Sequence, residues 1–438
     1  MGEIEINLTL RFKVPEGELN VNGVVRSLKD NISRISFAIL ECLFRAIEGK
    51  IIYEMKESEP GRYVKNGYQQ KPRQIRTSFG IFRYRLTQVY DKIKGKNLVL
   101  LRHNGFLQKY KQCTKESGEP GIGLAVHLSY RKSVKEIERI TGSSPSVSTL
   151  HRSLQEFSRD KCGWPDMKDK KFRFLMVDGT GVILQDGKGR TIKSTEMRWA
   201  LASAGEREPF KPVGLWIDKD WRDIKKDLKE RLNYKLIEVL FSDGELAMEL
   251  LLEEGMRHQR CLVHGKRDFE YLLYRDGLRK KEQIPLIQQL ENIPAFGLTK
   301  KRLEDIKEKD MSKVKELADK TVKGFEDMIE VLDPNVYPKS RTYIENLSKS
   351  ISTFFTWWLD HKAWIPLNTN AIESAFSLVK NRIKRIGRRW SEKGLINWLM
   401  VTMNKIFYPH MWKELWNQYL ELNPGFELLF IRSSYRWV

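Results

Sequence analysis

The chain has 438 residues, of which 41% are hydrophobic and 11% aromatic, enough apolar material for a large core and roughly two to four domains. Lysine and arginine number 78 against 57 aspartates and glutamates, giving a formal net charge of +21. This composition excludes a disordered chain and favours a polyanionic partner such as nucleic acid, but it does not separate an enzyme from a coat protein.

The cysteines and the apolar runs indicate the compartment. Cys42, Cys113, Cys162 and Cys261 are too few and too scattered for a disulfide framework, which suggests a reducing interior. The N-terminus begins with acids, unlike a secretory signal, and no uncharged apolar run reaches the roughly 18 residues of a membrane span. We expect a soluble, cytoplasmic protein, associated with the nucleoid if the source is prokaryotic.

The N-terminal region, 1–128, is predicted to be an α+β region for DNA binding or oligomerisation. Residues 3–13 alternate as a half-buried strand would, and 23–48 carry a helical period. Residues 62–101 are basic and aromatic and predict a hairpin or small sheet. This sheet would be a platform for the DNA backbone or simply a solvated basic surface.

Residues 129–165 have the outline of a helix-turn-helix. A short amphipathic helix is followed by a turn at Gly142 and by a second helix with Ser146 or Ser148 as its N-cap. In a DNA complex the second helix would lie in a major groove, with Ser148, Thr149 and Arg152 facing bases or phosphates. A helical hairpin without a DNA role remains the alternative.

From residue 172 strands and helices alternate. A buried strand (172–180), a hairpin (181–194) and a third strand (196–220) precede a helix at 221–232 and a strand at 235–243, and a helix at 245–255 and a short strand at 259–264 follow. Three strands in meander followed by this alternation predict an RNase H-like core, with its first part at 166–274. In that order the first and fourth strands are neighbours.

The remaining chain is predicted to be mainly helical. Residues 275–350 are charged and poor in strand formers, so we expect an all-helical insertion that interrupts the core. Residues 351–438 would supply the last part of the core and C-terminal helices. The predicted fold class is therefore α/β, with a DNA-binding region preceding an interrupted catalytic core.

Three distant acids stand at informative positions in this pattern. Asp178 and Asp243 each follow an apolar, β-branched run that stops at Asp-Gly, and Glu373 lies early in a helix that becomes strongly basic. Carboxylate oxygens suit hard divalent cations, and paired ions can promote phosphodiester cleavage. Asp-Gly is also a common turn, and Asp360 or Glu345 could replace Glu373 in the third role.

These residues carry a resemblance. VDGT at the first acid, SDGE followed by Cys-x-x-His at Cys261 and His264, and NAIES at the third acid after a helical segment resemble DDE transposases of prokaryotic insertion sequences, in the broad group that includes IS256-type and Mutator-like enzymes. The likeness covers about 129–274 and 351–400. Each motif alone is modest, but their order is fairly specific.

The resemblance implies roles for these residues. Asp178, Asp243 and Glu373 match the family's catalytic and metal-binding triad, which would hold two Mg²⁺ ions, with Mn²⁺ as a possible substitute, for cleavage at transposon ends and strand transfer into target DNA. Cys261 and His264 match a pair beside the active site. Double-stranded DNA would be the partner, and we expect a homodimer or higher oligomer on it and no membrane.

Two groups of side chains near the acids have alternative interpretations. His258, Cys261 and His264 could suggest zinc, but a second ligand pair at recognisable spacing is missing. A basic run after Glu373 would bind the phosphate backbone or form a solvated face; it consists of Lys380, Arg382, Lys384, Arg385, Arg388 and Arg389.

Two other function classes stay open. One is a structure-specific RNase H-like nuclease that does not transfer strands. The other is a sequence-specific DNA-binding protein that has lost cleavage. The helix-turn-helix favours the transposase over the nuclease, because recognition of an element's own ends requires sequence reading.

Overall fold

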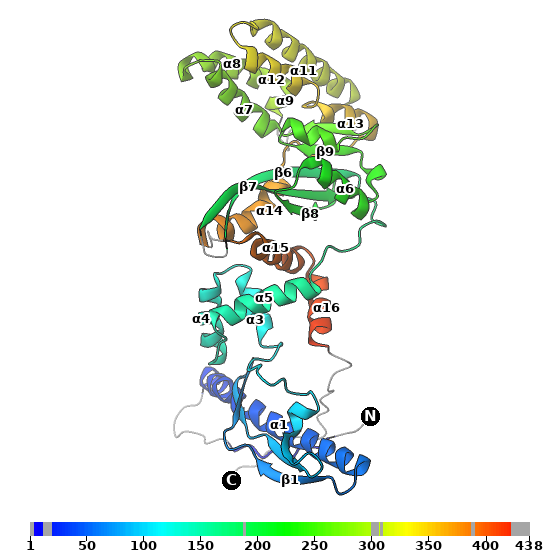
Figure 1. The fold of residues 1–438 in the computed structure, drawn as a ribbon. Coiled ribbons are helices and arrows are strands. Elements are labelled where there is room, and N and C mark those ends of the chain that lie inside the picture. Colours follow the sequence, from blue (N-terminus) through cyan, green and yellow to red (C-terminus); the bar gives the residue numbers. More distant parts are fainter. Residues whose placement is uncertain are drawn as a thin grey trace. The chain divides into compact units, whose positions relative to one another are not determined.

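The computed structural model describes residues 4–11, 20–186, 190–298, 306, 310–386 and 390–421. They form a mixed α/β structure with several sheets, as the sequence predicts at this level (Figure 1). The chain divides into two compact units, one made of Met1–Cys162 with His410–Val438 and the other of Gly163–Pro409. Within the described residues no helix is long and apolar enough to cross a membrane.

The strand expected at 3–13 is the clearest error near the N-terminus. Residues 4–11 form neither helix nor strand, and Ile4, Leu8 and Leu10 are exposed. Alternation supplies an apolar face but not the neighbouring strand whose hydrogen bonds a β-ladder requires. The positions flanking this segment lie outside the described residues.

The first unit joins a long helix to short antiparallel strands, as predicted for 23–48 and 62–101. Glu48 of the helix is buried and accepts hydrogen bonds from the Tyr84 hydroxyl (2.6 Å) and from Thr87 Oγ1 (2.6 Å), which ties the helix to the strands. The strands pair in the orders β1-β4-β5 and β2-β3. The elements are α1 (Val21–Ser58), β1 (Tyr63–Tyr68), β2 (Arg73–Thr77), β3 (Gly80–Tyr84), β4 (Thr87–Asp91) and β5 (Lys96–Val99).

The other helices of this unit include a three-helix cluster. Gly121 of α3 lies where Ile137 of α4 and Leu150 of α5 meet, since a Cβ there would come within 2.8 Å of both side chains. Phe157 of α5 stacks on Trp416 of α16 with ring centroids 4.2 Å apart. These helices, with the short α2, are α2 (Leu100–His103), α3 (Gly118–Ala125), α4 (Tyr130–Thr141), α5 (Val147–Lys161) and α16 (Pro409–Leu420).

The second unit is organised around a five-stranded sheet in the order β10-β9-β6-β7-β8. β6 pairs antiparallel with β7 and parallel with β9, so the predicted adjacency of the first and fourth strands is confirmed. The strands are β6 (Phe174–Gln185), β7 (Thr191–Ser203), β8 (Lys211–Ile217), β9 (Val239–Ser242) and β10 (Arg257–Arg260).

Three local predictions in and beside this sheet are wrong. The strand expected at 259–264 is β10, which ends at Arg260 before a helix begins at Leu262. β6 does not stop at Asp178-Gly179 but continues to Gln185, because the antiparallel ladder to β7 runs through Gly179 opposite Arg198. The helix expected at 245–255 is a short 3-10 segment, η2 (Leu246–Leu251). Sequence pattern alone did not distinguish a turn at Asp-Gly from a strand that its neighbour keeps extended.

The helices of this unit lie between the strands and after the last strand. Between the last strand and the third acid the described residues are helical, and Figure 1 draws α7, α8, α9, α11 and α12 clustered together. In chain order the elements are α6 (Trp221–Arg231), η1 (Tyr234–Leu236), α7 (Leu262–Arg275), α8 (Lys280–Asn292), α9 (Pro294–Gly297), α11 (Met311–Val331), α12 (Pro338–Ser348), α13 (Thr353–His361), α14 (Asn370–Lys380), the π-helical η3 (Asn381–Ile386) and α15 (Glu392–Phe407).

Candidate active site

Asp178 lies within β6, two residues beyond Met176, where the parallel pairing with β9 ends. Across the antiparallel pair it stands opposite Trp199 of β7, so both side chains project from the same face of the sheet. Asp178 is only 8% exposed, and its Oδ1 accepts a hydrogen bond of 2.7 Å from the Gly179 amide. This strand therefore presents a buried acid at the point where its neighbour stops.

Asp243 directly follows β9. The offset of 65 residues that pairs Met176 with Phe241 also relates Asp178 to Asp243, so the two acids extend from the end of the same parallel pairing. Gly244 has a φ of +101°, and the Glu245 amide donates to Asp243 Oδ1 at 3.2 Å. The predicted Asp-Gly turn is present here.

Glu373 lies in the first turn of α14. Phe376, three residues later and on the same face of the helix, packs on Trp199 with ring centroids 5.0 Å apart. Because Trp199 stands opposite Asp178, this contact brings the start of α14 over the sheet face that carries Asp178. The Glu373 side chain is 43% exposed.

The pKa of Asp178 is raised mainly by burial, and the neighbouring acids add to the rise. Burial and then the negative charge of Asp243 raise it to about 7, with a smaller contribution in the same direction from Glu373. The hydrogen bond from the Gly179 amide and the nearby His264 oppose the rise. Acids separated by most of the chain therefore interact electrostatically, and their negative charges are not fully compensated.

Cys261 and His264, the predicted site-adjacent pair, lie at the start of α7, and their role stays a prediction. His264 is buried at the start of α7, with Nε2 3.6 Å from Glu373 Oε1 and Nδ1 3.5 Å from Thr369 Oγ1. A hydrogen bond with Cys261 raises the pKa of His264 against the effect of burial. Burial would raise the pKa of Cys261, but hydrogen bonds with His264 and Thr369 outweigh it and lower that pKa. Thr369 was missed because no motif distinguishes it.

The donor set suits a hard divalent cation, because carboxylate oxygens are its preferred ligands and because a cation would relieve the repulsion among the acids. Among the described residues, no three His, Cys, Asp or Glu side chains are grouped closely enough to hold one ion. Asp178, Asp243 and Glu373 thus have the chemistry of a cation site, but their side chains must move closer together to enclose the ion.

The alternative third acids are engaged elsewhere. Asp360 forms an ion pair with Arg257, and Glu345 pairs with Arg341 at 3.0 Å. His258, the remaining member of the possible zinc set, has its Nε2 2.8 Å from Ser242 Oγ, and burial lowers its pKa to about 4. Asp360 and Glu345 are thus occupied by arginines, whereas the charge of Glu373 contributes to the raised pKa of Asp178.

Of the DNA-contact residues predicted on α5, Ser148 and Arg152 are exposed and Thr149 is half-buried. Ser146 is the N-cap, since its Oγ accepts from the Thr149 amide at 3.1 Å, and it also lies 2.9 Å from Ser148 Oγ. They belong to the first unit, whereas the acids belong to the second.

The basic run after Glu373 divides into different environments. Lys384 Nζ donates to Thr180 Oγ1 at 3.3 Å, two residues beyond Asp178 on β6, and Lys380 lies over the Phe376 ring. Arg382 is buried, and its guanidinium stacks on Trp390 at 4.8 Å. The side chain of Arg385 and all of Arg388 and Arg389 lie outside the described residues.

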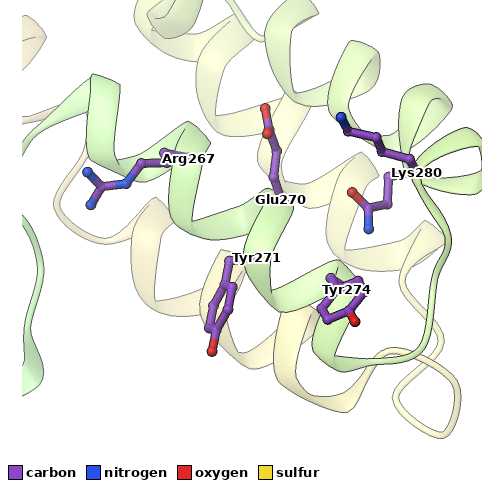
Figure 2. Close-up of a pocket in the computed structure, with 6 residues that line it drawn as sticks. Arg267, Glu270, Tyr271, Tyr274 and Lys280 are labelled. Carbon is purple, nitrogen blue, oxygen red and sulfur yellow. The ribbon is translucent and has the colours of Figure 1, made fainter.

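A separate hollow of about 500 Å³ lies on α7 and α8, some way along α7 from His264. Figure 2 shows Tyr271 and Tyr274 beside one another on α7, and their side chains are 61% and 69% exposed. Exposed aromatic rings beside cations are typical of surfaces that bind nucleic-acid strands. The sequence signal for this surface is a pair of tyrosines, three residues apart, that follows Arg267 in a helical pattern. The lining residues are Arg267, Glu270, Tyr271, Tyr274, Lys280 and Gln283.

The fold and this site describe a mixed α/β protein in which Asp178 and Asp243 extend from the end of a parallel strand pair, and Glu373 begins a helix that packs over the same sheet face. The chain belongs to the uncharacterised protein family UPF0236, whose sequence model matches residues 15–414. No curated protein matches the chain.

Proposed function

We propose that this protein is a DNA transposase of the DDE type, which cleaves DNA at transposon ends and transfers the strand into target DNA. The observation that carries the proposal is that Asp178 and Asp243 extend from the end of the same parallel strand pair, while α14, which carries Glu373, packs over that sheet face through Phe376 and Trp199. Acids that repel one another in a buried site are costly unless a ligand uses them.

The sheet supports an RNase H-like core. Its order, β8-β7-β6-β9-β10, places an antiparallel meander beside two parallel strands. That is the order expected of this core from the sequence, and the helical segment α8 to α12 interrupts it before α14 supplies the third acid. Fold likeness alone does not establish an activity, so the proposal rests on the acids rather than on the sheet.

Sequence recognition is assigned to α4 and α5 as a helix-turn-helix. α4 ends at Gly142 with a φ of +69°, and α5 starts five residues later at Val147 with a serine cap. α3 packs behind both helices through Gly121. The exposed side chains at the start of α5 would then reach base edges or phosphates in a major groove.

In the proposed reaction Asp178, Asp243 and Glu373 would hold two Mg²⁺ ions, or Mn²⁺ in their place. When bound, such ions activate a water or a 3′-hydroxyl and stabilise the leaving oxygen. The chain itself binds and orients the DNA, with Lys384 beside Thr180 placed to meet a phosphate near Asp178. His264 and Thr369 hold Glu373 and the start of α14 in position.

The partner would be double-stranded DNA, both the element's ends and the target. The protein would act in the cytoplasm, or on the nucleoid of a prokaryote, as a homodimer or larger assembly. The net charge of +21 supports attraction to DNA at any sequence. A structure-specific nuclease would share the acids but not require the exposed start of α5.

The test is cleavage of labelled DNA. The purified protein is incubated in Mg²⁺ with duplexes carrying the inverted repeats that flank its gene and with scrambled duplexes, alongside Asp178→Asn. Nicking of the repeat by the parent only, followed by strand transfer, supports a transposase. Equal cleavage by Asp178→Asn rejects the site. Cleavage without sequence preference supports the nuclease, and binding without cleavage supports an inactive DNA-binding protein.

A further inference from the structure

Arg260, the last residue of β10, is a buried cation without an acidic partner. The residue is 5% exposed, and its Nε has no hydrogen-bond partner. No acid among the described residues lies within ion-pair distance of its guanidinium. Its backbone is fully engaged, since the amide donates to the Ser350 carbonyl at 3.1 Å and the carbonyl accepts from Gln259 Nε2 at 2.7 Å.

The guanidinium lies beside the turn that carries Asp243. A Cβ on Gly244 would come within 2.0 Å of Arg260 Nε, so only glycine leaves room for this side chain. The φ of +101° at Gly244 gives a second reason for glycine. The Gly of the SDGE motif thus accommodates Arg260 as well as the turn.

Tyr343 of α12 supports the guanidinium from another side. The Arg260 Cζ lies 5.0 Å from the centroid of the Tyr343 ring, whose hydroxyl donates to the Gly265 carbonyl at 3.0 Å. Burial raises the pKa of Tyr343, and the charges of Arg260, Asp268 and Asp243 also act on it, in agreement with a position of the stacked pair near Asp243. A ring on one side and a turn on the other fix the plane of the guanidinium.

Two other arginines in the structure form the ion pair with a carboxylate that Arg260 does not form among the described residues. Arg62 donates to both carboxylate oxygens of buried Asp91, at 2.9 and 2.8 Å, and Arg173 likewise engages Glu238. Burying a guanidinium without such a partner is destabilising, as is breaking a buried ion pair. A cost of this kind is expected where an anionic ligand supplies the missing partner.

We infer that Arg260 binds a phosphate group of the DNA strand that lies across the acids. The inference rests on the proposed function for the identity of the ligand. A planar guanidinium can donate two parallel hydrogen bonds to phosphate oxygens, which fixes orientation as well as distance. Arg260 supplies the positive charge opposite the acids, and the phosphate lies between the two.

The test measures DNA binding and thermal unfolding together, in EDTA, so that cleavage and metal play no part. Arg260→Met and Arg260→Lys are compared with Arg173→Met, the matched control at the opposite end of the sheet. The probe is a short fluorescein-labelled duplex of scrambled sequence, titrated over a range of salt concentrations, because phosphate contacts are independent of sequence.

We expect Arg260→Met to bind the duplex about 10-fold more weakly and to reduce the salt slope by about one, since each phosphate contact contributes roughly 0.9. Its unfolding temperature should equal or exceed that of the parent, while Arg260→Lys retains the slope but loses part of the affinity. Arg173→Met should lower the unfolding temperature and leave the salt slope unchanged.

A structural role for Arg260 gives the opposite pattern. If Arg260→Met unfolds at a lower temperature, or fails to fold, and Arg260→Lys binds with the parent's affinity, the guanidinium supports the turn rather than DNA. An unchanged salt slope in Arg260→Met overturns the inference as well. Because these measurements need no cleavage, they stand apart from the Asp178→Asn test of the catalytic proposal.

Discussion

The two ends of the β6–β9 pair carry different arrangements of charge, an ion pair at one end and two neighbouring acids at the other. At the amino end Arg173 donates to both Glu238 oxygens, at 2.7 and 3.0 Å. At the carboxyl end, the same offset along the chain brings Asp178 to Asp243, two acids whose mutual repulsion helps raise the pKa of Asp178 to about 7. One end pairs opposite charges within the chain, and the other brings two like charges together, which in our proposal a cation neutralises.

This difference separates structural charge from functional charge within one pair of strands. An ion pair closed in the fold gains nothing from added cations, whereas a cluster of acids gains as soon as a cation neutralises it. The stability of the amino end should therefore be insensitive to divalent ions, and that of the carboxyl end should depend on them.

The largest effect is expected from breaking the carboxyl end. Glu373→Gln should reduce cleavage on the order of 10³-fold, because a neutral amide cannot replace a carboxylate in stabilising the ions and because electrostatic groups of this kind contribute that much. Asp360→Asn, which removes an acid paired with Arg257, should leave cleavage within about twofold. Gel assays of nicked duplex compare the two, and equal losses would refute the assignment of Glu373.

Because the pKa of Asp178 is raised, the stability contributed by the carboxyl end of the strand pair should depend on pH. Its folded value of about 7 lies above its unfolded value, so the contribution of its proton to stability is complete below about pH 4 and is lost as the pH rises through about 7. Without metal, stability should fall by up to about 4 kcal/mol over that window. Between pH 5 and pH 8 the expected part of this fall is about 3 kcal/mol, which urea unfolding in EDTA measures.

Asp178→Asn provides the control for the pH measurement. The amide cannot titrate, so the fall between pH 5 and pH 8 should be nearly absent in the variant. Mg²⁺ should raise the parent's stability more at pH 8 than at pH 5 and should not do so in the variant. A parent that is equally stable at both pH values would show that Asp178 is not held in the repulsive cluster.

His264 should have an intermediate effect. His264→Gln removes the imidazole that lies 3.6 Å from Glu373, so the glutamate is held less firmly, and we expect a 10- to 100-fold loss of cleavage that higher Mg²⁺ partly restores. The Mg²⁺ concentration for half-maximal cleavage should rise in the same variant. An unchanged Mg²⁺ dependence would mean that His264 does not position Glu373.

Breaking the amino end should have the smallest effect. Glu238→Gln weakens a partly exposed ion pair with Arg173, which should cost about 1 kcal/mol of folding free energy and less at high salt. Cleavage by the folded variant should match that of the parent. A loss of cleavage without unfolding would remove the distinction between the two ends.

The sequence predicted the elements that depend on local pattern. The helix at 221–232 and the helical pair around Gly142 were found where their apolar periods and caps placed them. The strand expected at 235–243 is shorter, at Val239–Ser242, and follows a 3-10 turn at Tyr234–Leu236. The adjacency of β6 and β9 also followed, because few strand orders suit a meander followed by alternating strands and helices. Asp178 and Asp243 were therefore predictable as neighbours.

The features of the fold and the site that the sequence did not predict depend on contacts between residues far apart in the chain. Strand β6 continues past Asp178 because β7 holds it extended, which the Asp-Gly pair does not reveal. Glu373 is brought to the site by the packing of Phe376 on Trp199. Arg260 lies beside Gly244, although the two are sixteen positions apart in the sequence. Side-chain packing of this kind has no period in the sequence, so only the fold discloses it.

Crystals grown with Mn²⁺ test the central claim most directly, because anomalous scattering locates the ion without assuming any activity. The account predicts an anomalous peak bound by carboxylate oxygens of Asp178 and Asp243, with Glu373 drawn toward it. A structure in which Mn²⁺, at concentrations that support cleavage, binds elsewhere and leaves these three carboxylates without an ion would contradict it.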